Sequence, residues 1–235
     1  MGDPCLQAVS VRVMRPGASR DADREALRAF VAEVTDTDPA LVRVVRRCPH
    51  CGAADHGRPS ALVADRQVPV SLARTSGAVV LAVGPGPLGV DVERPSRVTA
   101  AALDVFTPGE RARAAAEVLP AAGDAHRTAC WAVKESVLKR DGRGLRVDPV
   151  LVEAVLGPLR NGGDGDGHRD GDSDGGDDRD HDGDHDHARF AGDEQPVTVL
   201  LLDDDLVLAV AAGGVPVHVQ DVRGPAAARV RPQQR

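Results

Sequence analysis

The sequence predicts an α+β fold of two similar halves, each with a long helix and a group of strands. Residues 8–14 alternate in polarity, as a strand with one buried face does. Segments 20–34 and 123–140 lack proline and place apolar residues at roughly helical spacing. Short apolar runs follow both segments, so helices and strands are grouped, which is typical of the α+β class.

The halves are predicted to span residues 1–95 and 96–235, because Arg94-Pro95 stops a strand. A short helix is expected at 98–105. Thr107, Pro108 and Glu110 then have the pattern of a capping box at the start of a helix that runs to about Leu119. The expected strands after residue 60 are 68–73, 78–84, 88–93, 197–202, 206–212 and 215–219, and 147–156 is strand or helix.

Composition restricts the class of protein. The chain has 235 residues, 42% of them apolar and 2% aromatic, so a sizeable core of Val, Leu and Ala is expected. No apolar run is long enough to span a membrane, and no signal peptide is visible. A cytoplasmic protein with its four cysteines reduced is the expectation.

The net charge of −7 is concentrated in one segment. Residues 161–187 hold 11 Asp and 2 Arg and have no apolar side chain, so they are expected to form a disordered insert. The rest of the chain has 25 acidic and 27 basic residues and few aromatics, which argues against nucleic-acid binding. Asp170 begins a calcium-loop pattern, but its twelfth position is His181 and the pattern fails.

The most informative stretch is Trp131–Leu145, which contains both lysines of a chain with 27 arginines. On a helix, Trp131, Glu135 and Lys139 are at i, i+4 and i+8 and share one face. Two interpretations follow. The residues form a solvated ion pair, or they form a site that needs a compact cation beside a carboxylate.

Asp91 and Glu93 form a second pair. They alternate with apolar residues on a predicted strand and therefore point to the same side of it. Carboxylates suit Mg²⁺, which takes one or two of them together with phosphate oxygens and water. The alternative is an exposed strand face.

Two further segments have open interpretations. Cys48 and Cys51, with His50 and His56 nearby, form half of a zinc-site pattern. Arg58 follows on a turn, where it is a surface residue or an anion contact. The segment Arg74-Thr75-Ser76-Gly77 is a hairpin turn, and its cation and hydroxyls could also hold a phosphate.

Together the motifs resemble the 4'-phosphopantetheinyl transferases, in particular the long monomeric type that activates surfactin synthetase and other peptide and polyketide synthetases. The resemblance extends from about Cys48 to Pro149. It rests on Gly89-Val90-Asp91-Val92-Glu93, Phe106-Thr107-Pro108-x-Glu110, Trp131-x-x-Lys134-Glu135-Ser136-x-x-Lys139 and Gly142-x-Gly144-Leu145. It implies two α+β halves related by a pseudo-two-fold axis, each with a long helix against a small antiparallel sheet, and a coenzyme A site between them.

The resemblance also implies roles for individual residues. Asp91, Glu93 and Glu135 match the Mg²⁺ ligands, and Glu135 also matches the residue that helps to deprotonate the attacking serine. Lys139 matches the lysine that contacts the pyrophosphate and steadies the leaving 3',5'-ADP, and Lys134 a second phosphate-side contact. Coenzyme A contacts are implied for Arg58, Arg74 and Thr75. Arg74 stands where the family usually has histidine.

The implied activity is Mg²⁺-dependent transfer of 4'-phosphopantetheine from coenzyme A to a serine of an apo acyl or peptidyl carrier protein. The carrier would belong to a fatty-acid, polyketide or non-ribosomal peptide synthase, often in secondary metabolism, and the enzyme would be a monomer. One alternative is a degenerate homologue that binds carrier domains without turnover. A weaker alternative is a metal-binding protein that uses the Asp- and His-rich insert.

Overall fold

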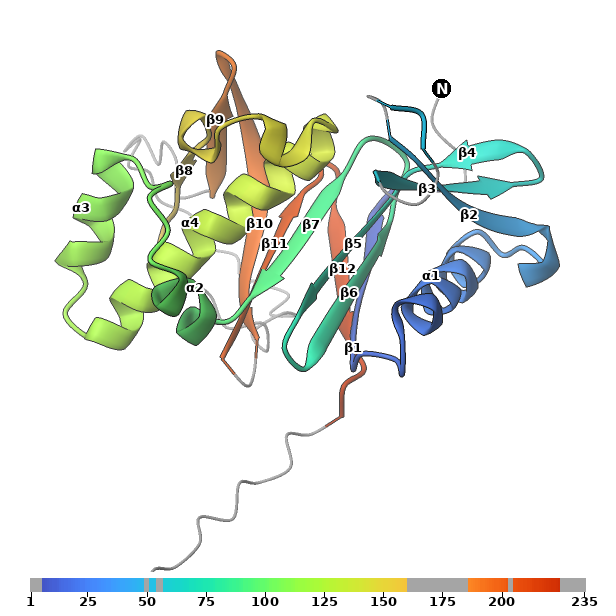
Figure 1. The fold of residues 1–235 in the computed structure, drawn as a ribbon, viewed down its shortest axis with the longest axis horizontal. Helices are drawn as coiled ribbons and strands as arrows, with labels where there is room; N and C mark the ends of the chain where they lie inside the picture. The colour runs from blue at the N-terminus through green and yellow to red at the C-terminus, as the bar shows by residue number, and fades with distance from the viewer. Residues whose placement is uncertain (1–5, 49–50, 54–56, 160–185, 203–204, 225–235) are drawn as a thin grey trace, which may run out of the picture.

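Two β-sheets pack face to face and carry a long helix on each outer face (Figure 1). The computed structural model describes residues 6–48, 51–53, 57–159, 186–202 and 205–224. The fold is α+β, as the sequence predicts. The layers run from helix α1 (Arg20–Val34) through the first and second sheets to helix α4 (Pro120–Asp141).

The first sheet has the strand order β12 (Val217–Asp221), β1 (Val9–Met14), β6 (Ala78–Val83) and β5 (Val70–Thr75). Beside it lies a small sheet of β2 (Val42–Arg47), β3 (Arg58–Val63) and β4 (Arg66–Val68). Helix α1 covers these strands on one side, and Leu27, Phe30 and Val31 of its apolar face are buried against them.

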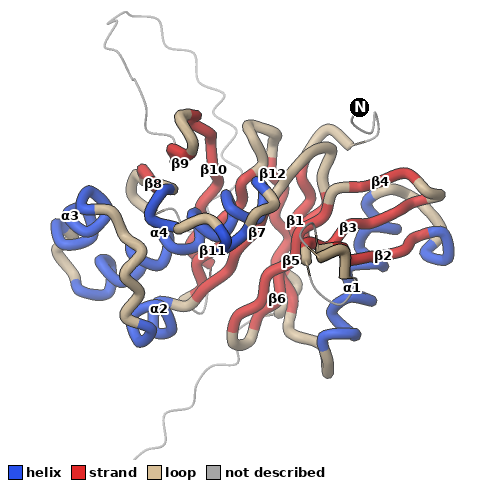
Figure 2. Tube along the Cα trace, turned by 45° about the horizontal axis from the view of Figure 1, so that its top comes forward, coloured by secondary structure: helices blue, strands red, loops and turns tan. Residues whose placement is uncertain are grey.

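The second sheet has the order β7 (Gly89–Glu93), β11 (Leu206–Ala211), β10 (Asp193–Leu202), β9 (His187–Phe190) and β8 (Glu153–Val155). Its outer face is covered by α4, while α2 (Pro95–Ala101) and α3 (Pro108–Ala116) pack against α4 (Figure 2). Of the helices that the structure describes, none has both the length and the apolar content that a bilayer crossing requires.

Strands β6 and β11 are uninterrupted apolar runs because both of their faces are buried. In β6, Val79 and Leu81 face the α1 side, whereas Val80 faces the second sheet. In β11, Leu208 faces the first sheet and Ala209 faces α4. These two strands form the interior of the layered arrangement.

The two sheets meet along β5 and β7, where the backbone N–H of Val90 donates to Oγ of Ser71 at 3.1 Å. Strand β12 pairs in parallel with β1. The first sheet is therefore mixed, whereas an antiparallel sheet was expected. Strand β7, which precedes the predicted boundary at residue 95, pairs with β11. The division into residues 1–95 and 96–235 and the two-fold relation of the halves stay predictions.

Several element boundaries differ from those predicted. Helix α4 starts at Pro120 rather than at residue 123, because proline at the first helical position lacks only an N–H that has no intrahelical partner there. The short helix begins at Pro95 rather than at residue 98. Arg58 begins strand β3 instead of lying on a loop. The expected insert 161–187 lies mostly outside the described residues, and its last residue, His187, begins β9.

Helix α4 touches strand β7 backbone to backbone at Gly89. A Cβ atom added to Gly89 would lie 2.0 Å from the carbonyl oxygen of Ser136 and 2.6 Å from the amide nitrogen of Arg140. No side chain fits in that space. The next residues of β7 therefore face the last turns of α4 at the shortest distance that two main chains allow.

We predict that Gly89→Ala lowers the free energy of unfolding by about 3 kcal/mol, the upper end of the usual overpacking range, because the atoms in the way belong to backbone. Urea denaturation followed by circular dichroism measures the change. Gly86→Ala is the matched control, since an added Cβ there meets nothing within 4 Å. Equal stability of the two variants would contradict the close packing of α4 on β7.

Candidate active site

The face of β7 that carries Asp91 and the last turns of α4 bring a lysine and carboxylates together. Nζ of Lys139 lies 2.6 Å from Oδ1 of Asp91 and 3.4 Å from Oε2 of Glu135. Asp91 is 5% exposed, and its second oxygen, Oδ2, is buried without a hydrogen-bond partner in the described part of the chain. The face that the sequence predicted for Glu135 and Lys139 is therefore the face that meets Asp91.

The carboxylates of this cluster repel one another. Burial, and then the charge of Asp91, raise the pKa of both Glu93 and Glu135 above the ordinary value for glutamate. Burial alone would lower the pKa of Lys139, but the attraction of Asp91 and Glu135 outweighs it and the pKa is raised. The cluster thus holds more negative charge than a single ammonium group neutralises.

Thr75 and Arg74 lie at the end of β5, next to this cluster. The buried hydroxyl of Thr75 donates to Oε2 of Glu93 at 3.1 Å, so it orients a predicted metal ligand. Nε of Arg74 donates to Oδ2 of the buried Asp23 on α1 at 2.6 Å. Coenzyme A contacts for Thr75 and Arg74 stay predictions, and the structure gives both residues a protein partner.

A cavity of about 280 Å³ opens beside Lys139. Arg58 forms part of its wall and is held by two backbone carbonyl groups, those of Leu88 at 3.0 Å and Arg140 at 3.2 Å. Arg58 therefore connects β3 to the start of β7 and the end of α4. The other cationic side chains that line this cavity are Arg46, Arg143 and Arg146.

A second cavity, of about 440 Å³, adjoins the first and is lined by Arg20, Arg24, Arg46 and Arg74. Arg46 lines both cavities. Burial, and then repulsion by Arg24, Arg74 and Arg20, lower the pKa of Arg46. Sequence reasoning missed Arg20, Arg24 and Arg46 because arginine is abundant throughout the chain and Arg46 is far in sequence from the pair on α1.

Lys134 lies away from this cluster, inside the protein. Its side chain is fully buried, and Nζ lies 2.9 Å from Oε1 of the buried Glu110. Nζ also donates to the carbonyl oxygens of Pro149, at 3.2 Å, and of Val152. An ammonium group enclosed by these oxygens is not available to a phosphate, so the expected phosphate contact of Lys134 is replaced by a structural role.

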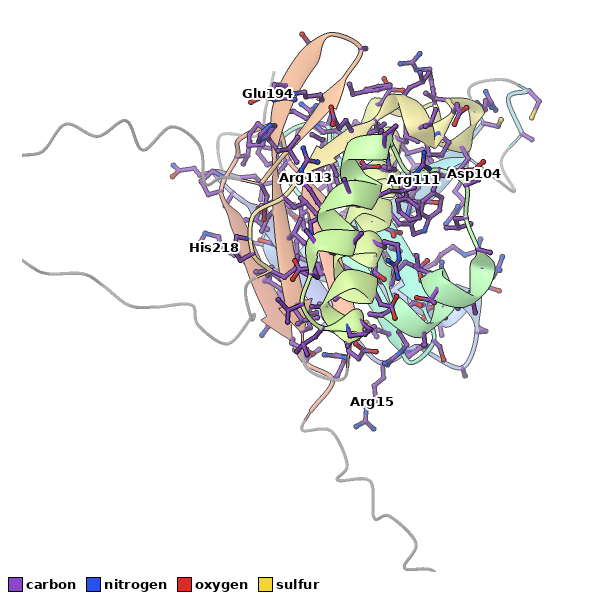
Figure 3. The ribbon with its side chains drawn as sticks, turned by 90° about the vertical axis from the view of Figure 1, so that its left-hand side faces the viewer. Arg15, Asp104, Arg111, Arg113, Glu194 and His218 are labelled. Carbon is purple, nitrogen blue, oxygen red and sulfur yellow. The ribbon has the colours of Figure 1, made fainter. Side chains whose placement is uncertain are left out.

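Glu110 ties three segments together. Its Oε2 accepts from the backbone of Thr107, which completes the predicted capping box of α3, and Oε1 accepts from the backbone of Ala154 at 2.8 Å. Arg113 lies one turn further along α3 (Figure 3), and it donates to the carbonyl oxygen of Ala154 at 3.2 Å. The pair of Glu110 and Lys134 therefore holds α3 and β8 against α4, away from the side that carries Glu135 and Lys139.

The cysteines supply no evident chemistry in the described residues. Cys130 is buried, and desolvation raises the pKa of its thiol to about 12, which makes it a poor nucleophile. Cys48 is buried, with its Sγ 3.3 Å from Nη2 of Arg146, and Cys51 is exposed. His50 and His56, the other members of the zinc pattern, lie outside the described residues.

The donors at Asp91, Glu93 and Glu135 fit a small divalent cation. All are hard oxygens, one buried oxygen of Asp91 has no partner among the described residues, and the charge of the cluster is in excess. No three His, Cys, Asp or Glu side chains among the described residues form a preassembled metal centre. The Lys139 ammonium group lies between Asp91 and Glu135, and the ligand set stays a prediction.

Comparison with known proteins finds a family match for part of the chain. Residues 87–161 match the family model described as the 4'-phosphopantetheinyl transferase superfamily. The matched segment is less than half of the chain and includes β7, α2, α3 and α4, and with them Asp91, Glu93, Glu135 and Lys139. A search of curated proteins finds no match. The match supports a transferase of this kind.

We predict that Lys134→Met lowers the free energy of unfolding by about 3–5 kcal/mol, because it leaves the carboxylate of Glu110 buried without its partner. Adding Glu110→Gln should recover part of the loss. Urea denaturation of both variants measures the difference. Arg43→Met, which breaks the exposed pair with Asp65, is the control and should change stability by less than about 0.5 kcal/mol. Equal losses in Lys134→Met and Arg43→Met would contradict the structural role of Lys134.

A second prediction concerns Glu93 and pH in metal-free buffer. Because the pKa of Glu93 is raised from its ordinary value of 4.5, its ionised form destabilises the folded state. This penalty is absent well below pH 4.5 and grows as the pH rises through the folded pKa. Glu93→Gln should therefore be more stable than wild type at pH 7, and the difference should shrink at pH 4.

Glu33→Gln provides a control of opposite sign, because Arg12 lowers the pKa of Glu33. Removing that carboxylate should decrease stability at pH 7, and the loss should be smaller at pH 4, because the stabilisation fades as the pH falls from 4.5 through the folded pKa. Chemical denaturation at the two pH values gives both differences. A Glu93→Gln variant that is less stable than wild type at pH 7 would contradict the charge excess in the cluster.

Proposed function

We propose that this protein transfers 4'-phosphopantetheine from coenzyme A to a serine hydroxyl of an apo carrier protein and releases 3',5'-ADP. The observation that carries the proposal is the meeting of Asp91, Glu135 and Lys139 at a cavity lined by arginines, within a segment that matches the transferase superfamily. A lone ion pair on a helix surface would lack both the buried carboxylate of Asp91 and the adjoining cavities.

The adjoining cavities suit coenzyme A because that molecule carries a diphosphate and a separate 3'-phosphate. A guanidinium group can donate two parallel hydrogen bonds to a phosphate, and it stays charged at any physiological pH. Lys139, Arg46 and Arg58 line one cavity, and Arg46 continues into the cavity lined by Arg20, Arg24 and Arg74. We place the diphosphate near Lys139 and the 3'-phosphate toward Arg74.

Asp91, Glu93 and Glu135 would hold Mg²⁺ at this place. When bound, Mg²⁺ supplies positive charge to the phosphate oxygens during transfer. Thr75 keeps the carboxylate of Glu93 in position through its hydrogen bond of 3.1 Å. The close approach of α4 to β7 holds Glu135 and Lys139 opposite Asp91.

In the proposed reaction the serine oxygen of the carrier protein forms a bond to the phosphorus that carries the pantetheine arm. The bond from that phosphorus to the bridging oxygen of 3',5'-ADP breaks. Glu135 accepts the serine proton as the general base. Lys139 places its positive charge beside the leaving diphosphate oxygen.

The finer assignments belong to this proposal as well. The resemblance to the long monomeric transferases extends before the matched segment to Gly57-Arg58-Pro59, although Arg74 stands where the family usually has histidine. We therefore propose a cytoplasmic monomer that acts on carrier proteins of fatty-acid, polyketide or non-ribosomal peptide synthases. The neutral balance of the chain outside residues 161–187 and its few aromatics give no reason to propose a nucleic-acid partner.

The test is the mass of an apo carrier protein incubated with the full-length protein, coenzyme A and Mg²⁺. We expect the carrier to gain one phosphopantetheine group. Glu135→Gln removes the proposed general base and Asp91→Ala removes a proposed Mg²⁺ ligand. Each should lower the rate by at least about 100-fold, while the variants keep the wild-type circular dichroism spectrum.

Glu25→Gln is the matched control, because Glu25 lies on the exposed face of α1 and pairs only with its helix neighbour Arg28 in the contacts that the structure describes. It should transfer at the wild-type rate. A panel of carriers from the three kinds of synthase guards against the choice of a wrong partner. Binding of carriers without any mass gain would favour the degenerate homologue instead.

A further inference from the structure

The ammonium group of Lys139 occupies the place that the proposed metal ion would need. It lies 2.6 Å from Oδ1 of Asp91 and 3.4 Å from Oε2 of Glu135, and both residues belong to the proposed ligand set. Mg²⁺ and Mn²⁺ bind carboxylate oxygens at about 2.1 Å. An ammonium ion and a divalent cation that share these carboxylates therefore repel each other at short range.

Lys139 neutralises only part of the negative charge of the cluster. Asp91, Glu93 and Glu135 together carry three negative charges when they are ionised, and Lys139 supplies one positive charge. Oδ2 of Asp91 is buried and has no partner in the described residues. The cluster thus still attracts a further cation, while the positive charge of Lys139 repels it.

The side chain of Lys139 also has a second place to go. It is 29% exposed and forms part of the wall of the cavity that contains Arg46, Arg58 and Arg143. The long, flexible stem of lysine lets its ammonium group move by several ångströms without a change in the backbone. An anion in this cavity would offer the ammonium group a new partner away from Asp91.

We propose that Lys139 is an internal counter-ion that weakens metal binding until a polyanion in the neighbouring cavity draws its ammonium group away from Asp91. Metal and polyanion then bind cooperatively, each tightening the other by the same factor. The inference rests on the proposed function for the identity of the polyanion, coenzyme A. It adds that the free protein has low affinity for the metal and acquires the ion together with the cofactor.

The experiment titrates full-length protein with Mn²⁺ and measures free Mn²⁺ by electron paramagnetic resonance. Without coenzyme A, Lys139→Met should bind Mn²⁺ about 10-fold more tightly than wild type, a factor within the usual range of coupling between sites. Adding coenzyme A should tighten Mn²⁺ binding about 10-fold in wild type and much less in Lys139→Met. A titration of coenzyme A without protein corrects for Mn²⁺ that coenzyme A binds itself.

Arg127→Met is the matched control, because Arg127 lies on the same helix and its ion pair is with Asp124. It removes one positive charge outside the cluster and should leave Mn²⁺ affinity at the wild-type value. Lys139→Gln repeats the neutralisation with a different side chain in case Lys139→Met does not fold.

Unchanged or weaker Mn²⁺ binding in the folded neutral variants would overturn the inference, as would wild-type affinity that coenzyme A does not alter. These outcomes are separate from those of the transfer assay, since the titration needs no carrier protein. Transfer by wild type together with unchanged Mn²⁺ affinity in Lys139→Met would leave the proposed function standing alone. Tighter Mn²⁺ binding in that variant, without transfer to any carrier by wild type, would support the counter-ion role of Lys139 and contradict the proposed function.

Discussion

The contact between the backbones of α4 and β7 at Gly89 is the constraint on which the site depends. A glycine there lets the helix approach until an added Cβ would stand 2.0 Å from a carbonyl oxygen. Asp91 follows two residues later on the same face of the strand, and Lys139 lies one turn after Ser136 on the helix. Their 2.6 Å contact is a direct result of this packing. With a larger residue at position 89, the same side chains would face each other across a wider gap.

The two lysines of the chain have different surroundings, one enclosed in the protein and one beside a cavity. Lys134 is fully enclosed, and three oxygens surround its ammonium group on the side where α3 and β8 pack. Lys139 borders a cavity and shares two carboxylates. A guanidinium group is larger and planar, and it would not fit the enclosure of Lys134. The scarcity of lysine elsewhere in a chain with 27 arginines is therefore consistent with two positions that each need a compact cation.

Sequence patterns predicted the parts of the site that depend on local spacing. The strand face of Asp91 and Glu93, the helix face of Glu135 and Lys139, and the capping box at Thr107 all follow from periods of two or about four residues. Patterns could not show which way Lys134 points, because it is adjacent to Glu135 and its burial depends on the distant Glu110. The arginine-lined cavity was also out of reach, since α1, β2 and β5 each contribute to it. Such convergence comes from tertiary packing.

The parallel pairing of β12 with β1 has a consequence for biosynthesis. Val9 of β1 aligns with Val217 of β12, so these partners are more than 200 residues apart in the sequence. While the ribosome is still making residues 187–211, β1 has a neighbour only on its β6 side and its other edge is exposed. The nascent amino-terminal sheet is therefore incomplete until the last strand has emerged, and contacts of such long sequence separation form slowly. A chaperone that shields this open edge during translation would protect the protein from strand-to-strand aggregation.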